Sequence, residues 1–287
     1  MSETVIQVRG LVKRFGALKA VSGVSFDVKR GEIFGILGPN GAGKTTILEC
    51  IEGVQKADDG AVLVLGMNTI EHPRQVKDRI GVQLQSSAYF DRLTLTEILN
   101  LFGKMYSRRV EPGRLLKLVD LSEKAGTVIK ALSGGQKQRF TLAASLVNDP
   151  AVVFLDEPTT GLDPLARRNF WELIERMPEE GRTVVLTTHY MEEAQHLCGR
   201  VAVMDAGEIM ALDSPSELIR RLSTPFEIRL LTSIPVAKEE LAELPGVQQP
   251  VSRDGEYYVL PSTSTETTFP ALLQWLNDKA ASPLHLE

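Results

Sequence analysis

A short glycine-rich segment constrains this chain more than any other feature of the sequence. Residues 38–46 read GPNGAGKTT, and they lie between the apolar run IFGIL at 33–37 and the helical run ILECIEGV. In the spacing G-x-x-x-x-G-K-[ST], the glycines let backbone N–H groups turn inward around phosphate oxygens, and the helix that follows adds its positive end. The lysine, Lys44, neutralises the β- and γ-phosphates, and the hydroxyl of Thr45 suits Mg²⁺. The segment predicts a nucleotide-phosphate site between a buried strand and a helix.

Two carboxylates follow a second apolar run. AVVFL at 151–155 predicts a buried strand, and Asp156 and Glu157 come directly after it. Asp156 is suited to holding Mg²⁺, directly or through water, while Glu157 is aimed differently and can polarise a water for attack on the γ-phosphorus. An acid pair after a strand is more often a helix cap or a solvated strand end. The phosphate loop upstream favours the catalytic interpretation.

The pentapeptide LSGGQ at 132–136 predicts a second phosphate-binding device. It places a serine hydroxyl and two glycines just before the helical stretch QKQRFTLAASLV, so a second helix N-terminus with free N–H groups is exposed. One ATP does not need two such devices from one chain. The pattern therefore indicates a site shared between two chains.

These motifs resemble the ATP-binding cassette (ABC) family of transporter ATPases, and the resemblance covers roughly residues 4–222. It implies an α/β P-loop NTPase fold with a mainly parallel sheet, an antiparallel N-terminal part and a helical insertion at about 86–150. It also implies that the chain hydrolyses ATP with Mg²⁺. Two copies would face each other head to tail, with Lys44 and Thr45 of one and Ser133–Gln136 of the other enclosing each ATP.

The resemblance assigns roles to further residues, position by position. The ATP-binding set comprises Phe15, whose ring stacks on adenine, and Gly38, Pro39, Asn40, Gly41, Ala42, Gly43, Lys44, Thr45 and Thr46. The site presented to the partner copy comprises Ser133, Gly134, Gly135, Gln136 and, in the sequence GLDP, Asp163. The catalytic set is Glu157, the switch histidine His189 and Gln85, and the metal set is Thr45, Gln85 and Asp156.

Several of these assignments have a simpler alternative. Phe15 is also consistent with a core phenylalanine, because an aromatic face serves either role. Gln83 competes with Gln85 for the role of the glutamine that follows a strand. An N-cap role alone is enough to explain Asp163 before Pro164. A lone histidine after a strand is more often structural, but the spacing of His189 from Asp156 favours the switch role.

Tyr89 and Phe90 follow the glutamine loop and would be unfavourable in water without a partner. In the family this region holds a groove for a cytoplasmic helix of the membrane subunit. Packing inside the helical insertion is the alternative, and both interpretations stay open at this point.

The composition changes after Arg221, and Ser223–Pro225 is typical of a joint between domains. We expect an ABC ATPase domain over 1–222 and an accessory domain over 226–287. The second segment predicts strands at 226–231, 247–251 and 256–260, helices at 236–244 and 267–280, and the start of a last strand. This βαββαβ order is typical of a ferredoxin-like α+β fold. Because the last strand stops early at Leu-Glu, we expect the C-terminus to be truncated.

The net charge of −5 and the scatter of basic residues argue against nucleic acid as a partner. No run approaches the roughly 18 apolar residues of a spanning helix, and the N-terminus lacks a signal-peptide pattern. We therefore expect a cytoplasmic protein that is peripheral to the inner face of the cell membrane. Two cysteines, Cys50 and Cys198, form neither a disulfide framework nor a metal-binding spacing.

The sequence thus predicts the ATP-hydrolysing subunit of an ABC transporter, with transmembrane subunits on separate chains and a second nucleotide-binding subunit that makes a homodimer. The stretch GVQLQSSAYFDRLTLTEILNLFGKMY and the size of the appendage look most like exporter cassettes with ABC-2 type membrane partners. Two alternatives are an importer cassette with a ligand-regulated C-terminal domain and a soluble ABC ATPase of DNA repair or translation. The second alternative carries a long coiled-coil insert or two cassettes in one chain, and residues 46–132 leave room for neither.

Overall fold

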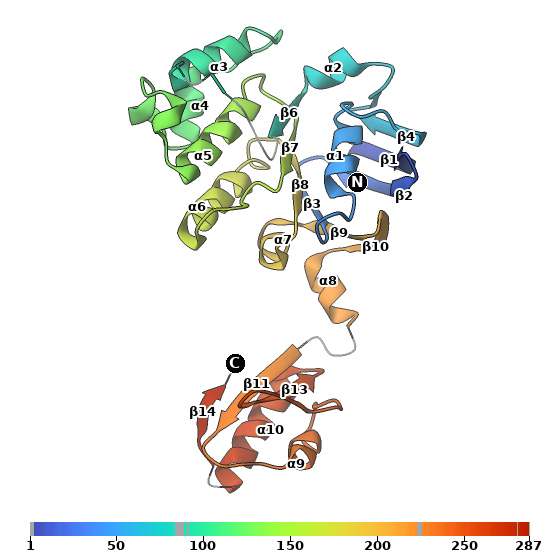
Figure 1. Ribbon diagram of the computed structural model, residues 1–287, viewed down its shortest axis with the longest axis vertical. Coiled ribbons are helices and arrows are strands. Elements are labelled where there is room, and N and C mark those ends of the chain that lie inside the picture. Colours follow the sequence, from blue (N-terminus) through green and yellow to red (C-terminus); the bar gives the residue numbers. More distant parts are fainter. Residues whose placement is uncertain (1–2, 84–88, 91, 223–225, 280, 287) are drawn as a thin grey trace. The chain divides into compact units, whose positions relative to one another are not determined.

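The structure is a computed structural model that describes residues 3–83, 89–90, 92–222, 226–279 and 281–286 (Figure 1). Its internal contacts divide the chain into two compact units, Met1–Pro215 and Ser216–Glu287. This division falls earlier than the boundary expected at 222. The predicted joint at 223–225 lies outside the described residues.

The first unit is built on a six-stranded sheet with the strand order β10-β9-β3-β8-β7-β6. Pairs β6–β7, β7–β8, β8–β3 and β3–β9 are parallel, and β10 pairs antiparallel with β9. The strands are β3 (Ile33–Leu37), β6 (Ile80–Gln83), β7 (Val152–Asp156), β8 (Thr183–Thr188), β9 (Arg200–Asp205) and β10 (Glu208–Asp213). Every residue of β7 and β8 is buried, which explains their almost uninterrupted apolar runs. The buried strands predicted at 33–37 and 151–155, which are β3 and β7, are confirmed.

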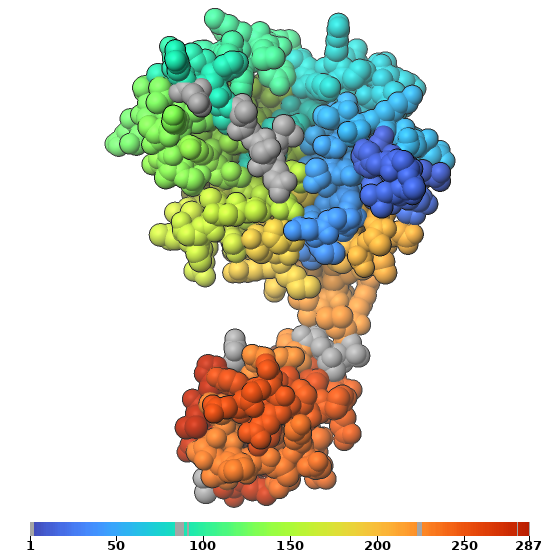
Figure 2. All heavy atoms as spheres, viewed as in Figure 1, coloured from blue at the N-terminus to red at the C-terminus, as the bar shows by residue number. Residues whose placement is uncertain are grey.

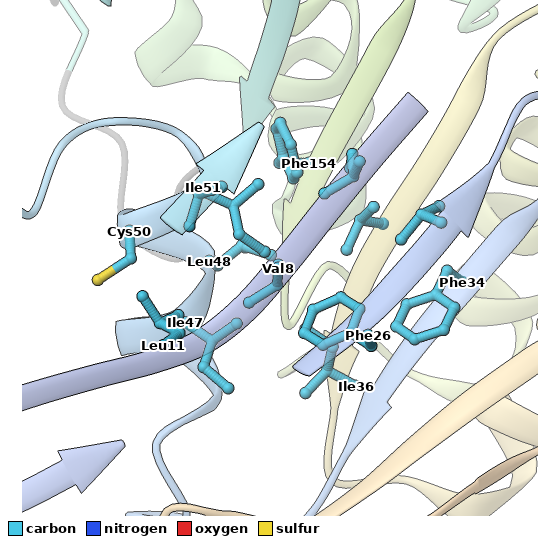
Figure 3. Close-up of a cluster of buried hydrophobic side chains, with 14 of the residues drawn as sticks. Val8, Leu11, Phe26, Phe34, Ile36, Ile47, Leu48, Cys50, Ile51 and Phe154 are labelled. Carbon is cyan, nitrogen blue, oxygen red and sulfur yellow. The ribbon is translucent and has the colours of Figure 1, made fainter. Parts of the chain in front are cut away.

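A second, antiparallel sheet with the order β2-β1-β4-β5 forms the N-terminal part. It comprises β1 (Thr4–Phe15), β2 (Leu18–Lys29), β4 (Asp59–Val64) and β5 (Met67–Asn68). Its apolar face and α1 (Lys44–Ile51) enclose a core with the central sheet, in which the rings of Phe26 and Phe34 stack with centroids 5.2 Å apart (Figure 3). Ile47, Leu48 and Ile51 contribute one face of α1 to this core, so the helix after the glycine-rich segment is anchored by apolar burial.

Polar side chains cap helices of the first unit. Thr94 and Glu97 form a capping box at the start of α3 (Leu95–Gly103), and Asp163 caps α6 (Pro164–Glu175), which begins at a proline as expected. The remaining helices of the first unit are α2 (Pro73–Lys77), α4 (Pro112–Leu118), α5 (Gly134–Ser145) and α7 (Met191–Leu197), with 3₁₀ turns at Ser122–Lys124 and Ile129–Ala131. Helices α3, α4 and α5 form the helical part, drawn in shades of green in Figure 2.

The second unit contains α8 (Pro215–Arg220) and a sheet of order β12-β13-β11-β14, in which each neighbouring pair is antiparallel. Its elements are β11 (Phe226–Thr232), α9 (Lys238–Ala242), β12 (Ser252–Asp254), β13 (Tyr257–Ser262), α10 (Thr265–Asp278) and β14 (Pro283–Leu286). Strand order 2-3-1-4 with two helices is the ferredoxin-like arrangement, so that expectation is confirmed.

The strand expected at 247–251 is wrong in its bounds. Val247 makes an isolated bridge to Ser262, and β12 begins only at Ser252. Pro250 lies inside the expected run and has no N–H to donate to a ladder, which explains the delayed start. Among the described residues, no helix has the length and apolar character that crossing a bilayer requires.

Candidate nucleotide site

The glycine-rich segment adopts a loop in which two positions require glycine. Gly43 is the N-cap of α1 with φ 97°, and Gly41 has φ 84°. A Cβ on Gly43 would also collide with the carbonyl oxygen of Ala20. Both glycines are therefore required by backbone geometry, and the loop leads directly into the N-terminus of α1, as the sequence predicts.

Lys44 lies beneath this loop with its side chain almost fully buried. Its Nζ donates to the carbonyl oxygens of Gly38 at 3.0 Å and Pro39 at 3.1 Å, and it is 3.3 Å from Oε1 of Glu157. A buried ammonium is tolerated because these oxygens replace its hydration. The cation is thus positioned at the centre of the loop before any phosphate is present.

Asp156 ends β7 beside the loop. Its Oδ1 accepts hydrogen bonds from the hydroxyl of Thr45 at 3.2 Å and from that of Thr187, at the end of β8. Asp156 and Thr187 are register partners in the parallel ladder, so the sheet itself brings them together. Sequence reasoning missed Thr187, because a threonine within an apolar run gives no signal until the order of strands is known.

Glu157 has a left-handed backbone, with φ 46°, and its N–H donates to Oγ1 of Thr187 at 3.0 Å. Its carboxylate lies 3.3 Å from Nδ1 of His189 and accepts from the hydroxyl of Thr160 at 3.2 Å. Burial acts to raise the pKa of Glu157, but Lys44 and then His189 outweigh it, so this pKa is held below its usual range. The carboxylate is therefore ionised at neutral pH and able to accept a proton.

A cavity of about 530 Å³ opens over these groups. It is lined by Lys44, Thr45, Thr46 and Glu157 together with Phe15, Leu18, Lys19, Ala20, Asn40, Gly41, Gly43, Ala206 and Gly207. Phe15 is 46% exposed, so the alternative of a core phenylalanine is wrong. An exposed aromatic face beside a phosphate loop is what a purine base requires for stacking.

The LSGGQ residues lie on the helical part. Ser133 caps α5, accepting from the N–H of Gln136 at 3.3 Å, while the Gln136 side chain accepts from the N–H of Ser133 at 3.0 Å. Asp163 caps α6 through the N–H of Ala166 at 2.9 Å. These hydrogen bonds are local to each helix, and none of the three residues lines the cavity over the phosphate loop.

Gln85 lies outside the described residues. Its competitor Gln83 is buried at the end of β6, and neither of its amide atoms has a hydrogen-bond partner among the residues that the structure describes. Gln83 does not line the nucleotide cavity. Tyr89 packs against Phe102 and Phe140, with ring centroids 6.0 and 5.4 Å away, whereas Phe90 is 59% exposed. Tyr89 therefore does contribute to packing of the helical part.

We expect Thr187→Val to destabilise the protein by about 1–3 kcal/mol, because it leaves a buried N–H and a buried carboxylate oxygen without their shared partner. Urea unfolding measures the change. Thr187→Ser is the matched control, since it keeps the hydroxyl, and it should lose clearly less. A larger loss for Thr187→Ser than for Thr187→Val would mean that packing of the methyl group, and not the hydroxyl, holds this site.

Comparison with known proteins agrees with this geometry. The family model described as ABC transporter matches residues 21–160. The chain is 43% identical over 224 residues to the Nod factor export ATP-binding protein I of Ralstonia nicotianae, which covers 76% of this chain and 70% of the relative. It is 37% identical over 234 residues to the linearmycin resistance ATP-binding protein of Bacillus subtilis, covering 80% and 75% respectively.

A solved structure of a dimeric ATP-binding cassette in a post-hydrolysis state, bound to ADP and Pi, is also similar. It shares 26% sequence identity and a TM-score of 0.66, and the match covers 73% of this chain and 98% of that chain. The phosphate loop, the carboxylate pair at the end of β7 and the similarity to ATP-binding proteins over most of their length thus point to one family. The chain belongs to the ABC transporter family, as an ATP-binding subunit that hydrolyses ATP to power transport.

Proposed function

We propose that this chain powers export through separate transmembrane subunits of the ABC-2 type. The observation that supports export is the identity to relatives named for export and for antibiotic resistance, over most of their length. In this proposal the chain is cytoplasmic and lies on the inner face of the cell membrane, held there by the transmembrane subunits.

The site residues have the following roles in the proposed reaction. The phosphates of ATP lie in the loop at 38–46, and the adenine stacks on Phe15. Lys44 exchanges its contact with Glu157 for phosphate oxygens. Glu157 takes a proton from the water that attacks the γ-phosphorus, as the bond to the β-phosphate oxygen breaks, and His189 orients the water and the γ-phosphate.

Thr45 and Asp156 fit a Mg²⁺ ion. Their oxygens, 3.2 Å apart, are hard donors of the type that this ion prefers, and they lie at the end of the phosphate loop. When bound, the ion neutralises charge on the β- and γ-phosphate oxygens. Gln85 completes the proposed metal set.

We propose that two copies of the chain form a head-to-tail homodimer. Ser133–Gln136 and Asp163 of one copy would then face the phosphate loop of the other copy. Each site would in this way receive, from the partner copy, the second helix N-terminus that its own chain does not bring to it. The dimeric form of the similar ADP-bound cassette supports this arrangement.

Transport in vesicles tests the proposal. The tagged chain is purified with its transmembrane subunits and reconstituted so that the cassettes face the outside. Added ATP should then drive a panel of fluorescent lipophilic antibiotics into the lumen. ATP-dependent release from the lumen would indicate import instead, and failure to purify with any membrane subunit would contradict a role in transport.

Truncation after Leu222 tests the proposed division into an ATPase domain at 1–222 and an accessory domain at 226–287. The second unit has an apolar core of its own, formed by residues such as Ile228, Leu230 and Leu272. We therefore expect the truncated chain to stay folded and to bind ATP unchanged in calorimetry. Any loss should be confined to the hydrolysis rate, dimer stability or coupling. A truncated chain that cannot fold or bind ATP would make residues 226–287 part of the ATPase.

A further inference from the structure

Glu193 is a buried acid to which the proposed reaction gives no role. It lies in the first turn of α7, the helix that begins two residues after His189, and it is 0% exposed. Its Oε1 accepts two hydrogen bonds, from the hydroxyl of Thr159 at 2.7 Å and from the indole N–H of Trp171 at 2.9 Å. Its Oε2 is buried and has no hydrogen-bond partner among the residues that the structure describes. Burial of such a group is unfavourable unless its contacts offset the lost hydration.

The two donors to Glu193 come from different parts of the first unit. Thr159 is fully buried and lies two residues beyond Glu157, in the turn that follows β7. Trp171 lies in α6, which packs against α7 (Figure 1). One carboxylate oxygen therefore joins three segments: the turn that carries the proposed base, a supporting helix, and the helix that follows the switch histidine.

We call residues 157–160 the base turn, and its contacts connect Thr159 to the carboxylate of Glu157. Thr160 donates from its hydroxyl to Oε2 of Glu157 at 3.2 Å, and its N–H donates to the Glu157 carbonyl at 3.2 Å. The backbone of Glu157 is left-handed, with φ 46°, and such a conformation persists only where surrounding contacts hold it. The hydrogen bond from Thr159 to α7 is one of these contacts.

His189 stands at the other end of the connection. Its Nδ1 lies 3.3 Å from Oε2 of Glu157, and the side chain of Glu193, four residues further along, reaches back to Thr159. The base turn and the switch histidine are thus joined twice, once at the site and once behind it. Glu193 does not line the nucleotide cavity, so it acts on the reaction only through its neighbours.

Packing by itself does not require an acid at position 193. An apolar side chain of similar volume would fill the space between α6 and α7 without the cost of dehydrating a carboxylate, and such replacements are often neutral or stabilising. An oxygen is needed only where donors have to be held in a fixed direction. Of the two donors, Thr159 is the one that leads to the reacting groups.

We propose that Glu193 is a positioning residue for ATP hydrolysis: by accepting from Thr159 it fixes the base turn relative to α7. In this way it keeps Glu157 and His189 at their separation of 3.3 Å. The inference rests on the proposed function, in which Glu157 accepts the proton and His189 orients the water. Glu193 acts on kcat and not on ATP affinity, because the loop at 38–46 binds the phosphates without it.

Thr159→Val tests the proposal, since it removes the donor and keeps the shape of the side chain. We expect kcat to fall at least about tenfold, because small displacements of reacting groups have large effects on rate. ATP affinity, measured by calorimetry, should stay within about twofold of the wild type. Trp171→Phe is the matched control: it removes the other hydrogen bond to the same oxygen and should keep kcat within about twofold. Equal losses of kcat in the two variants would overturn the proposal, since Glu193 would then serve only to hold the core together.

Two replacements of Glu193 itself separate hydrogen bonding from packing. Glu193→Gln keeps an oxygen that accepts from Thr159 and should keep kcat within about threefold, whereas Glu193→Leu should lose as much as Thr159→Val. Combining Thr159→Val with Glu193→Leu should cost no more than either change alone, because both remove the same hydrogen bond. Additive losses, or equal losses for the Gln and Leu variants, would contradict the proposal. If Glu193→Leu does not fold, the comparison of Thr159→Val with Trp171→Phe decides alone.

Glu157→Gln, measured alongside, distinguishes failure of this inference from failure of the proposed function. If Glu157→Gln hydrolyses ATP like the wild type, Glu157 is not the base and the role of Glu193 falls with it. If Glu157→Gln is inactive while Thr159→Val keeps the kcat of the wild type, the proposed function stands and only the role of Glu193 is wrong.

Discussion

Glu157→Gln is expected to bind ATP normally and to hydrolyse it at least about 100-fold more slowly than the wild type. The amide keeps the shape of the side chain, but it can no longer accept the proton that the proposed reaction delivers to the Oε atoms. Trapped ATP should then hold two chains together. Turnover is measured by phosphate release, and association by size exclusion at saturating ATP.

Glu192→Gln is the control for this variant. Glu192 lies in the first turn of α7, close to His189 in sequence, and is exposed. The same loss of charge there should leave turnover unchanged. Normal turnover by Glu157→Gln would exclude it as the base, and a variant that stays monomeric with bound ATP would count against the head-to-tail dimer.

Lys44→Ala is expected to lower ATP affinity by about 100-fold or more, because it removes two charge-assisted contacts to phosphate worth about 1.5–3 kcal/mol each. The carbonyls of Gly38 and Pro39 lose their donor as well. Calorimetry measures the affinity, and circular dichroism establishes that the variant is folded.

Lys19→Ala is the matched control, since Lys19 lines the same cavity but is exposed. Solvent screens its charge, so its removal should have little effect on affinity. Undiminished affinity of a folded Lys44→Ala variant would refute the assignment of residues 38–46 as the phosphate loop.

The parts of the site that depend on local geometry could be predicted from the sequence. Glycine is required at position 43 by a positive φ at a helix N-cap. The capping boxes that begin at Thr94 and Ser133 follow from the three-residue spacing between two polar side chains. Each is settled within a few residues of chain. The same holds for the buried strand that ends at Asp156.

Features that depend on which strands are neighbours could not be predicted in this way. Thr187 reaches Asp156 only because β7 pairs with β8. In the second unit, the order of elements was predicted correctly, but Pro250 displaced the start of β12. Tertiary contacts determine these features, and the pattern of a single sequence does not show which segments are in contact.

The backbone at Glu157 suits asparagine or glycine better than glutamate, and a left-handed conformation at such a residue costs about 1–3 kcal/mol. The backbone angle by itself therefore favours replacing this glutamate. In a duplicated copy that no longer has to hydrolyse ATP, the backbone at this position would favour residues other than glutamate. Gly41 and Gly43 would still be required by their own positive φ angles. Such copies should lose the base first and keep the phosphate loop, so that cassettes which bind nucleotide without cleaving it arise more readily than cassettes which have lost both abilities.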